Sequence, residues 1–291
     1  MKKIAIYGQY LHDDTVNTCV ELIELLHSKK CETLIESSFH ELLKNENVAT
    51  QLNSFYTLDE SYDLLISLGG DGTVLRAVAY IGKVNIPVIG INTGRLGFLA
   101  TLNKEKLKEA IDALYDGSYT LSKRSLITLS SSSGEHHNSP HNFALNEVTV
   151  SRMNTTSMIQ IETRLNNELL TSYWADGLII STPTGSTGYS LSCGGPVISP
   201  SNTSFVITPI APHNLNARPL VIPDHTEIMI KVSGREEEFL TSLDNRIASY
   251  PNETILTLKK ADFTIDLVEL QGQSFIKTIR EKLLWGEDKR N

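Results

Sequence analysis

The sequence predicts a two-part protein: an N-terminal α/β domain with a parallel, Rossmann-like sheet, followed by a mostly-β domain of the β-sandwich type. Up to about residue 100, strand-like and helix-like periodicity alternate, which is typical of a parallel sheet with helices on its faces. Short strand-like runs with turn signals then replace the helical periodicity until the C-terminal segment. We therefore assign residues 1–117 to the first domain and 118–271 to the second, and expect 272–291 to return to the first.

Strands and helices are expected to alternate along the first domain. The expected strands are residues 3–7, 33–35, 63–68 and 86–92. The expected helices are residues 15–29, 39–52, 74–81 and 104–115. Ligands of open α/β sheets bind beyond the carboxyl ends of the strands. The loop containing Asp71 and the loop Asn92-Thr93-Gly94 both lie at such ends, so we expect them to share one crevice.

The second domain is expected to consist almost entirely of strands. These are residues 126–129, 143–150, 157–164, 177–181, 205–208, 228–232, 254–258 and 263–270. The polar stretch 130–141 is expected to form an exposed hairpin loop. Its His136, His137 and His141 have no carboxylate or cysteine partners at ligand spacing, which favours solvated side chains over metal ligands. Residues 274–285 carry apolar side chains at helical spacing, and we expect this helix to dock on the first domain.

Composition excludes several classes of function. The net charge of −8 and the pI near 5.5 argue against binding to nucleic acid or to an anionic membrane, because no basic cluster is present to neutralise a row of phosphates. The sequence contains neither an apolar run of about 18 residues nor a signal peptide, so we expect a cytoplasmic protein without a membrane partner. Cys19, Cys31 and Cys193 include no C-x-x-C pair, which indicates reduced thiols instead of disulfides or a thiolate metal site.

The run Gly69-Gly70-Asp71-Gly72-Thr73 places one carboxylate among three glycines directly after an apolar strand. Glycine lets the backbone approach a ligand closely, so such a loop can aim N–H groups at phosphate oxygens while Asp71 faces the reacting group. A plain strand-to-helix turn with Asp71 as the helix N-cap explains the same residues. From these residues alone, both interpretations stay open.

A second group of candidate residues begins at Trp174-Ala175-Asp176-Gly177 and continues, after a short strand, through residues 182–192. This segment contains three Thr, three Ser and two Gly, and its hydroxyls and backbone amides suit a polar ligand held by many neutral hydrogen bonds. An elaborate turn rich in Ser and Thr caps is the alternative. Asp176 is either an Asx-turn residue or an acceptor for a ligand hydroxyl or amide.

Two further segments need an explanation. Asn146-Glu147 interrupts an apolar strand-like run. The pair either faces water on a solvated sheet face or binds a diol, because an amide beside a carboxylate can both donate to and accept from adjacent hydroxyls. The proline-framed loop 209–221 is either a rigid connector or part of a site.

Some familiar motifs are absent. The chain has no G-x-x-x-x-G-K-[ST], which excludes a P-loop, and no G-x-G-x-x-G that opens a helix to indicate a Rossmann dinucleotide site. It has neither H-E-x-x-H nor G-x-S-x-G, which removes the commonest zinc protease and serine hydrolase interpretations.

Taken in order, these motifs resemble the NAD kinase family over essentially the whole chain. The matching segments are Gly69 to Thr73, Asn92 to Leu99, Asn146-Glu147, Asp176-Gly177, Thr182 to Ser192, Pro212-His213 and Arg218-Pro219-Leu220. The Gly-Gly-Asp-Gly element alone is shared with diacylglycerol and sphingosine kinases and resembles a phosphofructokinase motif, so the order of the other motifs makes the resemblance specific.

The resemblance implies that ATP phosphorylates the 2′-hydroxyl of the adenosine ribose of NAD, giving NADP. It implies that Asp71 is the general base and that a divalent cation, Mg²⁺, accompanies the ATP phosphates. Gly70 and Gly72 would present backbone amides, and Arg76 would lie near the same phosphates unless it is a plain surface residue of the helix. The family forms dimers and tetramers, so a homodimer or homotetramer is implied as well.

The resemblance also assigns the NAD-binding residues. Asn146 and Glu147 would hold hydroxyls of the ribose and diphosphate region, Ala211 would line the pocket, and Phe98 would pack near an adenine. The residues implied to bind the nicotinamide riboside half are Asp176, Thr184, Thr187, Gly188, Tyr189, Ser190, Leu191 and Ser192.

Three positions depart from the commonest family pattern, namely Gly188, Trp174 and the segment Ser242-Leu243-Asp244-Asn245-Arg246. Trp174 and Arg246 are still counted among the cofactor-binding residues. A catalytically silent NAD sensor and a lipid or sugar kinase of the wider superfamily remain as alternatives.

Overall fold

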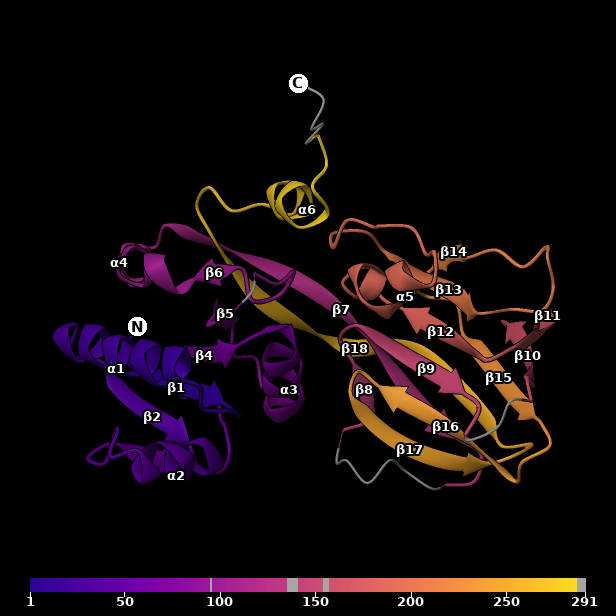
Figure 1. Ribbon diagram of the computed structural model, residues 1–291, viewed down its shortest axis with the longest axis horizontal. Helices are drawn as coiled ribbons and strands as arrows, with labels where there is room; N and C mark the ends of the chain where they lie inside the picture. Colours follow the sequence, from indigo (N-terminus) through magenta and orange to yellow (C-terminus); the bar gives the residue numbers. More distant parts are fainter. Residues whose placement is uncertain (95, 135–140, 154–156, 287–291) are drawn as a thin grey trace. The chain divides into compact units, whose positions relative to one another are not determined.

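The computed structural model describes residues 1–94, 96–134, 141–153 and 157–286 (Figure 1). The chain divides into two compact units. The first unit comprises Met1–Lys123 and Ile265–Asn291, and the second comprises Arg124–Thr264. The chain enters the second unit within β7 (Tyr119–Ser131) and leaves it within β18 (Ile255–Leu270), so the C-terminal segment belongs with the N-terminal part of the chain.

A parallel sheet with the strand order β5-β4-β1-β2-β3 forms the centre of the first unit. The strands are β1 (Lys3–Gly8), β2 (Glu32–Glu36), β3 (Asn53–Phe55), β4 (Leu64–Gly69) and β5 (Val88–Asn92). The short β6 (Leu102–Asn103) and the end of β18 both pair with β5 in parallel. From β1 the chain adds β2 and β3 on one side and then β4 and β5 on the other. The strand order therefore reverses between β1 and β4, which is where open α/β sheets bind ligands.

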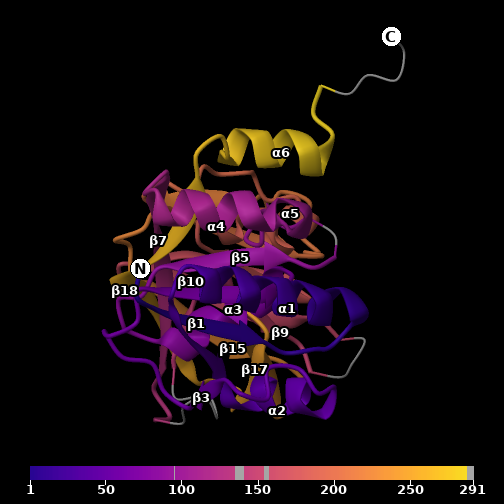
Figure 2. The same cartoon turned by 90° about the vertical axis from the view of Figure 1, so that its left-hand side faces the viewer.

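The helices of the first unit divide into two groups. They are α1 (Asp13–Ser28), α2 (Ser37–Asn45), α3 (Asp71–Ile81), the 3₁₀ helix η1 (Lys104–Lys106) and α4 (Leu107–Tyr115). Apolar side chains of α1, α2 and α4 share one core with the strands, and α1 lies alongside α4 (Figure 2). Helix α3 instead packs buried side chains such as Val74 and Val78 against β1, β4 and β5. Right-handed crossovers produce such a division when the strand order reverses.

The C-terminal helix α6 (Phe275–Leu283) is part of the first unit. Its N-cap Ser274 accepts a hydrogen bond from the backbone N–H of Lys277 at 3.1 Å. Just before the helix, the Gln273 side chain donates to the carbonyl of Thr101 at 3.4 Å, and within the helix Lys282 donates to the carbonyl of Leu96. Two side chains thus tie this helix to residues 96–101.

Two antiparallel sheets form the second unit, in the strand orders β11-β10-β15-β18 and β14-β13-β12-β9-β16-β17. The strands are β8 (Phe143–Ala144), which pairs with β7, β9 (Glu147–Ser151), β10 (Ile159–Leu165), β11 (Glu168–Ala175), β12 (Gly177–Ser181), β13 (Ser204–Ile210), β14 (Leu220–Pro223), β15 (Ile228–Ser233), β16 (Glu238–Leu243) and β17 (Arg246–Pro251). Side chains of both sheets, Ile161 and Phe205 among them, share one apolar core. The predicted two-part fold class and the C-terminal helix are confirmed.

Several local predictions differ from the structure. The expected helix 39–52 ends at Asn45, because Asn47 and Ala49 adopt positive φ of 59° and 56° and the N–H of Val48 returns to the carbonyl of Leu43. The expected strands 254–258 and 263–270 are one continuous strand, β18. Four strands of the second unit, β11, β14, β16 and β17, lie where no strand was expected.

The predicted histidine loop lies partly outside the described residues, which include neither His136 nor His137. His141 is half-buried instead of solvated, and its carbonyl accepts a hydrogen bond from Arg246 at 2.8 Å. Burial, with a smaller effect of the Arg246 charge, lowers the pKa of His141 below its usual value. No helix in the described ranges is long and apolar enough to cross a membrane.

Candidate functional site

The glycine-rich run joins β4 to α3 by a turn that only glycine can make. Gly69 has a φ of +148°, and a Cβ there would lie 2.3 Å from Oγ1 of Thr73. The N-cap of α3 is Gly70, whose backbone is extended, and Asp71 is the first helical residue. The interpretation of Asp71 as the N-cap is therefore wrong. Its side chain instead accepts hydrogen bonds from the backbone of residues 98–100.

The Asp71 carboxylate is held by three backbone N–H groups. Oδ2 accepts from Phe98 at 2.8 Å, and Oδ1 accepts from Leu99 at 2.9 Å and from Ala100 at 2.8 Å. A Cβ at Gly97 would lie 1.8 Å from Oδ1, so glycine is required for this close approach. Each carboxylate oxygen has two lone pairs. The contacts use both lone pairs of Oδ1 and one of Oδ2, which leaves Oδ2 able to accept one more hydrogen bond or a proton.

Asn92, at the end of β5, anchors the same segment. Its Oδ1 accepts from the N–H of Gly94 at 2.6 Å, and its Nδ2 donates to the carbonyl of Ala100 at 3.4 Å. The two loops predicted to share a crevice are therefore joined, since residues 98–100 bind both Asp71 and Asn92. Phe98 is half-buried, and its ring centroid lies 5.7 Å from the Nζ of Lys282.

The glycines of the loop are accessible. Gly70 and Gly72 are exposed, and a Cβ at Gly70 would meet nothing within 4 Å. Arg76, one helical turn further along α3, is also exposed and forms no ion pair within the described residues. Backbone amides and one cation are thus available near Asp71 for an anionic ligand.

In the second unit, Asp244 shapes the segment that carries Asn146 and Glu147. Its half-buried carboxylate accepts from the N–H groups of Leu145 at 3.0 Å, Asn146 at 2.8 Å and Glu147 at 3.2 Å. These bonds divert the backbone at residues 145 and 146 from the strand ladder, so the expected strand 143–150 is split into β8 and β9. Asp244 itself has a φ of +52° and donates its N–H to the carbonyl of Glu147 at 3.0 Å.

Asn146 and Glu147 each carry a buried oxygen without a protein partner. Among the described residues, Oδ1 of Asn146 and Oε2 of Glu147 are both buried and form no hydrogen bond. Burial, reinforced by the charge of Asp244, raises the pKa of Glu147 to about 8, although the N–H of Tyr189 opposes this shift. Buried polar atoms are usually paired in native proteins. Two adjacent unpaired acceptors therefore indicate a place that a ligand fills.

The segment 182–192 packs directly onto this pair. The N–H of Thr182 donates to the carbonyl of Asn146 at 2.9 Å, and its hydroxyl donates to the carbonyl of Leu145 at 2.6 Å. A Cβ at Gly185 would lie 2.1 Å from the Asn146 carbonyl oxygen, and one at Gly188 would lie 3.0 Å from Oε2 of Glu147. The two groups predicted separately are therefore adjacent in space.

This segment is helical instead of an open loop. It forms the 3₁₀ helix η2 (Gly185–Thr187) and the short helix α5 (Tyr189–Ser192). Some predicted ligand hydroxyls are already engaged: that of Thr187 donates to the Thr184 carbonyl at 3.1 Å, and that of Ser190 pairs with Thr208 at 2.8 Å. Tyr189 is 45% exposed and Ser192 is also exposed, while Leu191 is half-buried. Backbone groups and exposed side chains of this segment are therefore more available to a ligand than the buried hydroxyls.

Asp176 forms an ion pair with Arg152, which was not predicted from the sequence. The guanidinium of Arg152 contacts both carboxylate oxygens, with Nε 2.9 Å from Oδ1 and Nη2 3.4 Å from Oδ2. The N–H of His213 donates to the carbonyl of Trp174 at 2.8 Å, so the segment after β13 lies beside the end of β11. Trp174 itself is 52% exposed.

Ala211 and Arg246 differ in their surroundings. Ala211 follows β13 with a φ of +43°, a strained conformation for a residue with a Cβ and one that clusters at functional sites. The guanidinium of Arg246 donates to the carbonyls of His141 and Phe143. Arg246 thus supports the backbone just before Asn146, and burial lowers its pKa.

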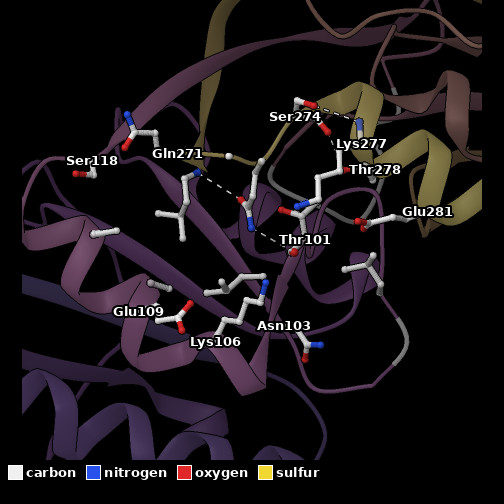
Figure 3. A pocket seen from close by; sticks show the side chains of 17 residues that line it. Thr101, Asn103, Lys106, Glu109, Ser118, Gln271, Ser274, Lys277, Thr278 and Glu281 are labelled. Atoms are coloured by element: carbon white, nitrogen blue, oxygen red, sulfur yellow. Dashed lines mark hydrogen bonds between the residues drawn. The ribbon is translucent and has the colours of Figure 1, made fainter.

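A separate cavity of about 520 Å³ lies in the first unit, between α4 and α6 (Figure 3). Its walls carry polar side chains, including Lys106, Lys277 and Glu281, but it does not include Asp71. Gln273 also lines it; its side chain donates to the Thr101 carbonyl and accepts from the N–H of Leu270. The described residues contain no cluster of three or more His, Cys, Asp or Glu side chains that could hold a metal ion.

Comparisons with known proteins cover both units. The family model described as ATP-NAD kinase N-terminal domain matches residues 4–119, and the one described as ATP-NAD kinase C-terminal domain matches residues 145–270. A protein named NAD kinase from Christiangramia forsetii is 54% identical over 99% of this chain and 100% of its own length. A Bacteroides fragilis protein of the same name is 41% identical, with 99% of each chain covered.

Two solved structures are also similar. Yeast NADH kinase complexed with NADH has a TM-score of 0.86 and 26% identity, with 99% of this chain and 89% of that chain covered. An NAD kinase from Archaeoglobus fulgidus in complex with ATP has a TM-score of 0.68 and 25% identity, with 97% of each chain covered.

Proposed function

Since the chain belongs to the ATP-NAD kinase family, whose reaction is the phosphorylation of NAD by ATP, we propose that Asp71 is the general base that activates the 2′-hydroxyl of the adenosine ribose. The observation that carries this proposal is the carboxylate geometry. Three N–H groups fix Asp71 while Oδ2 keeps one free lone pair. A base held in this way needs no reorganisation before it accepts a proton.

The proposed step transfers one proton and one phosphoryl group. The proton of the ribose hydroxyl passes to Oδ2 of Asp71 while its oxygen forms a bond to the γ-phosphorus of ATP, and the bond to the β-phosphate oxygen breaks to release ADP. Phosphoryl transfer has a loose transition state, so alignment and charge neutralisation supply most of the catalysis. A positioned base adds about 10² to 10⁴ in rate. The exposed amides of Gly70 and Gly72, with Arg76, are suited to bind the phosphates.

We propose that a divalent cation, Mg²⁺, arrives with ATP, where it neutralises charge on the phosphates. The described part of the chain offers no cluster of three ligating side chains. That fits Mg²⁺, which is usually bound through substrate phosphates and one or two carboxylates instead of an all-protein cage.

The second unit is proposed to bind NAD. The unpaired oxygens of Asn146 and Glu147 support this, because a ribose diol can satisfy both. We propose that the exposed Tyr189 and Ser192 and the half-buried Leu191 contact the nicotinamide riboside half, as do Trp174 and Asp176. Ala211 is proposed to line the pocket. Arg246 is proposed to act on NAD indirectly, since its guanidinium donates to backbone carbonyls near Asn146.

Incubation of the pure protein with ATP, Mg²⁺ and NAD tests the function, with NADP detected by a coupled dehydrogenase and the new phosphate located by NMR. We expect NADP carrying the phosphate on the 2′-oxygen. NAD binding without turnover would favour a sensor, and phosphorylation of a lipid but not of NAD would favour the wider superfamily. We further propose a cytoplasmic homodimer or homotetramer, which gel filtration at low concentration tests.

A further inference from the structure

The cavity of about 520 Å³ between α4 and α6 has no role in the proposed reaction. All of its walls belong to the first unit, and none of the residues proposed above to bind ATP or NAD lines it. Pockets that bind small molecules usually enclose about 300–1,000 Å³. The size of this cavity therefore fits a small ligand, and its side chains decide which kind.

Two walls of the cavity each carry one cation and one anion (Figure 3). Lys106 and Glu109 come from the start of α4, and Lys277 and Glu281 come from α6. Lys277 and Glu281 are neighbours on their helix, but a lysine that precedes a glutamate by four residues is the less favourable order for an intrahelical pair. In the part of the chain that the structure describes, none of the four side chains forms an ion pair. Both signs of charge are therefore available to an occupant on each wall.

The other polar side chains of the cavity are neutral. They include Thr101, Asn103, Ser118, Gln271 and Thr278. A purely anionic ligand would lie beside two glutamates, and a purely cationic one beside two lysines, so each would meet charges of its own sign. A molecule that carries both a carboxylate and an ammonium can form charge-assisted hydrogen bonds with both.

One wall of the cavity is formed by the segment that fixes the Asp71 carboxylate. Thr101 lines the cavity and directly follows Ala100, whose N–H donates to Oδ1 of Asp71 at 2.8 Å. The carbonyl of Thr101 accepts a hydrogen bond at 3.4 Å from the side chain of Gln273, which lies just before α6 and also lines the cavity. The cavity and the proposed base are therefore separated by one residue of the chain.

Helix α6 holds the other end of the same segment. Leu96 lines the cavity, and its carbonyl accepts a hydrogen bond from Lys282 of α6. A ligand that bridges α4 and α6 would therefore restrain residues 96–101 from both ends, and with them the carboxylate of Asp71.

We propose that this cavity is a regulatory site for an α-amino acid with a carboxamide side chain, and that its occupation raises the turnover of the enzyme. The α-carboxylate and α-ammonium match the lysine and glutamate of one wall. The carboxamide, which both accepts and donates hydrogen bonds, matches the pair on the other wall. The binding rests on the cavity alone, whereas the effect on turnover rests on the proposed function.

Calorimetric titration of the full-length protein with L-glutamine tests the site. Two analogues test the chemistry, because glutaramate lacks the α-ammonium and γ-aminobutyramide lacks the α-carboxylate. Each should bind about tenfold more weakly than L-glutamine, since each loses the charge-assisted hydrogen bonds to one sign of charge. Equal affinities for L-glutamine and glutaramate would indicate a plain anion site and contradict the proposal.

Lys277→Ala and Glu281→Gln should each weaken the binding of L-glutamine about fivefold or more. Neither should change the rate of NADP formation in the absence of L-glutamine. Arg280→Ala is the matched control, because Arg280 is an exposed cation of the same helix that does not line the cavity. It should bind L-glutamine as the unsubstituted protein does, and circular dichroism checks that each variant is folded. No binding to the unsubstituted protein, or unchanged binding to Lys277→Ala, would refute the site.

Steady-state formation of NADP measures the effect on turnover. L-Glutamine that saturates the unsubstituted protein should raise kcat about twofold to tenfold in that protein and in Arg280→Ala, but not in Lys277→Ala at the same concentration. Binding without a change in kcat would contradict a regulatory role. Failure of the unsubstituted protein to form NADP would refute the proposed function, while calorimetry would still decide the site.

Discussion

Glu147→Gln is expected to remove a pH-dependent loss of stability that is built into the second unit. Burial and the nearby Asp244 raise the pKa of Glu147 from an ordinary value of 4.5 to about 8. The folded state therefore binds more protons than the unfolded state between these two values, and the free energy of unfolding must fall as pH rises through that window. Below pH 4.5 the effect is absent, and above about pH 8 it is complete.

The size of this effect follows from the shift. Each pKa unit corresponds to about 1.36 kcal/mol, so a change from 4.5 to about 8 lowers the free energy of unfolding by up to roughly 5 kcal/mol. Glutamine has nearly the same shape and no charge, so the variant avoids this loss at every pH. The stability difference between Glu147→Gln and the unsubstituted protein should therefore grow from about 1 kcal/mol at pH 5 to several kcal/mol at pH 8.5.

Urea unfolding at half-unit pH intervals, followed by circular dichroism, measures the difference. Glu168→Gln is the matched control, because Glu168 is an exposed glutamate of the same unit and should leave the pH profile unchanged. Parallel profiles for Glu147→Gln and the unsubstituted protein from pH 5 to pH 8.5 would contradict a raised pKa at Glu147. They would mean that Glu147 is ionised in the folded protein at neutral pH.

Two further predictions concern the carboxylate of Asp71. Gly97→Ala should lower kcat by about 10² or more, because the new Cβ would lie 1.8 Å from Oδ1 of Asp71 and displace the base. Gly94→Ala is the control, because its Cβ would have its nearest neighbour 4.0 Å away. It should leave kcat unchanged in the same assay. Lys282→Ala should lower kcat about threefold to tenfold with little change in KM, because the hydrogen bond from α6 to the carbonyl of Leu96 is lost. Lys282→Arg should restore kcat, because arginine can donate the same hydrogen bond. A rise in KM alone would contradict a positioning role for this lysine.

The Asp71 turn was predictable because its signals are local. A buried strand, a glycine run and a helical pattern follow one another without interruption, and each has a direct physical reason. Asn146-Glu147 also stood out locally, as polar residues in an apolar run. The interpretation of that run as one strand failed because its cause is distant: Asp244 takes the N–H groups of residues 145–147 from 97 to 99 positions away.

Other residues of the site gave no usable signal in the sequence. Arg152 pairs with Asp176 across 24 positions and looks like any polar residue that follows a strand. A turn whose residues follow one another along the chain can therefore be predicted from the sequence, whereas pairing between distant turns requires the fold.

The Asp71→Asn substitution tests whether Asp71 acts as the base. Steady-state formation of NADP from ATP, Mg²⁺ and NAD should fall in kcat by about 10² to 10⁴, with calorimetric NAD affinity unchanged, because asparagine occupies the same space but cannot take up the proton. A variant that is folded, binds NAD and retains kcat within about twofold of the unsubstituted protein would show that Asp71 is not the base.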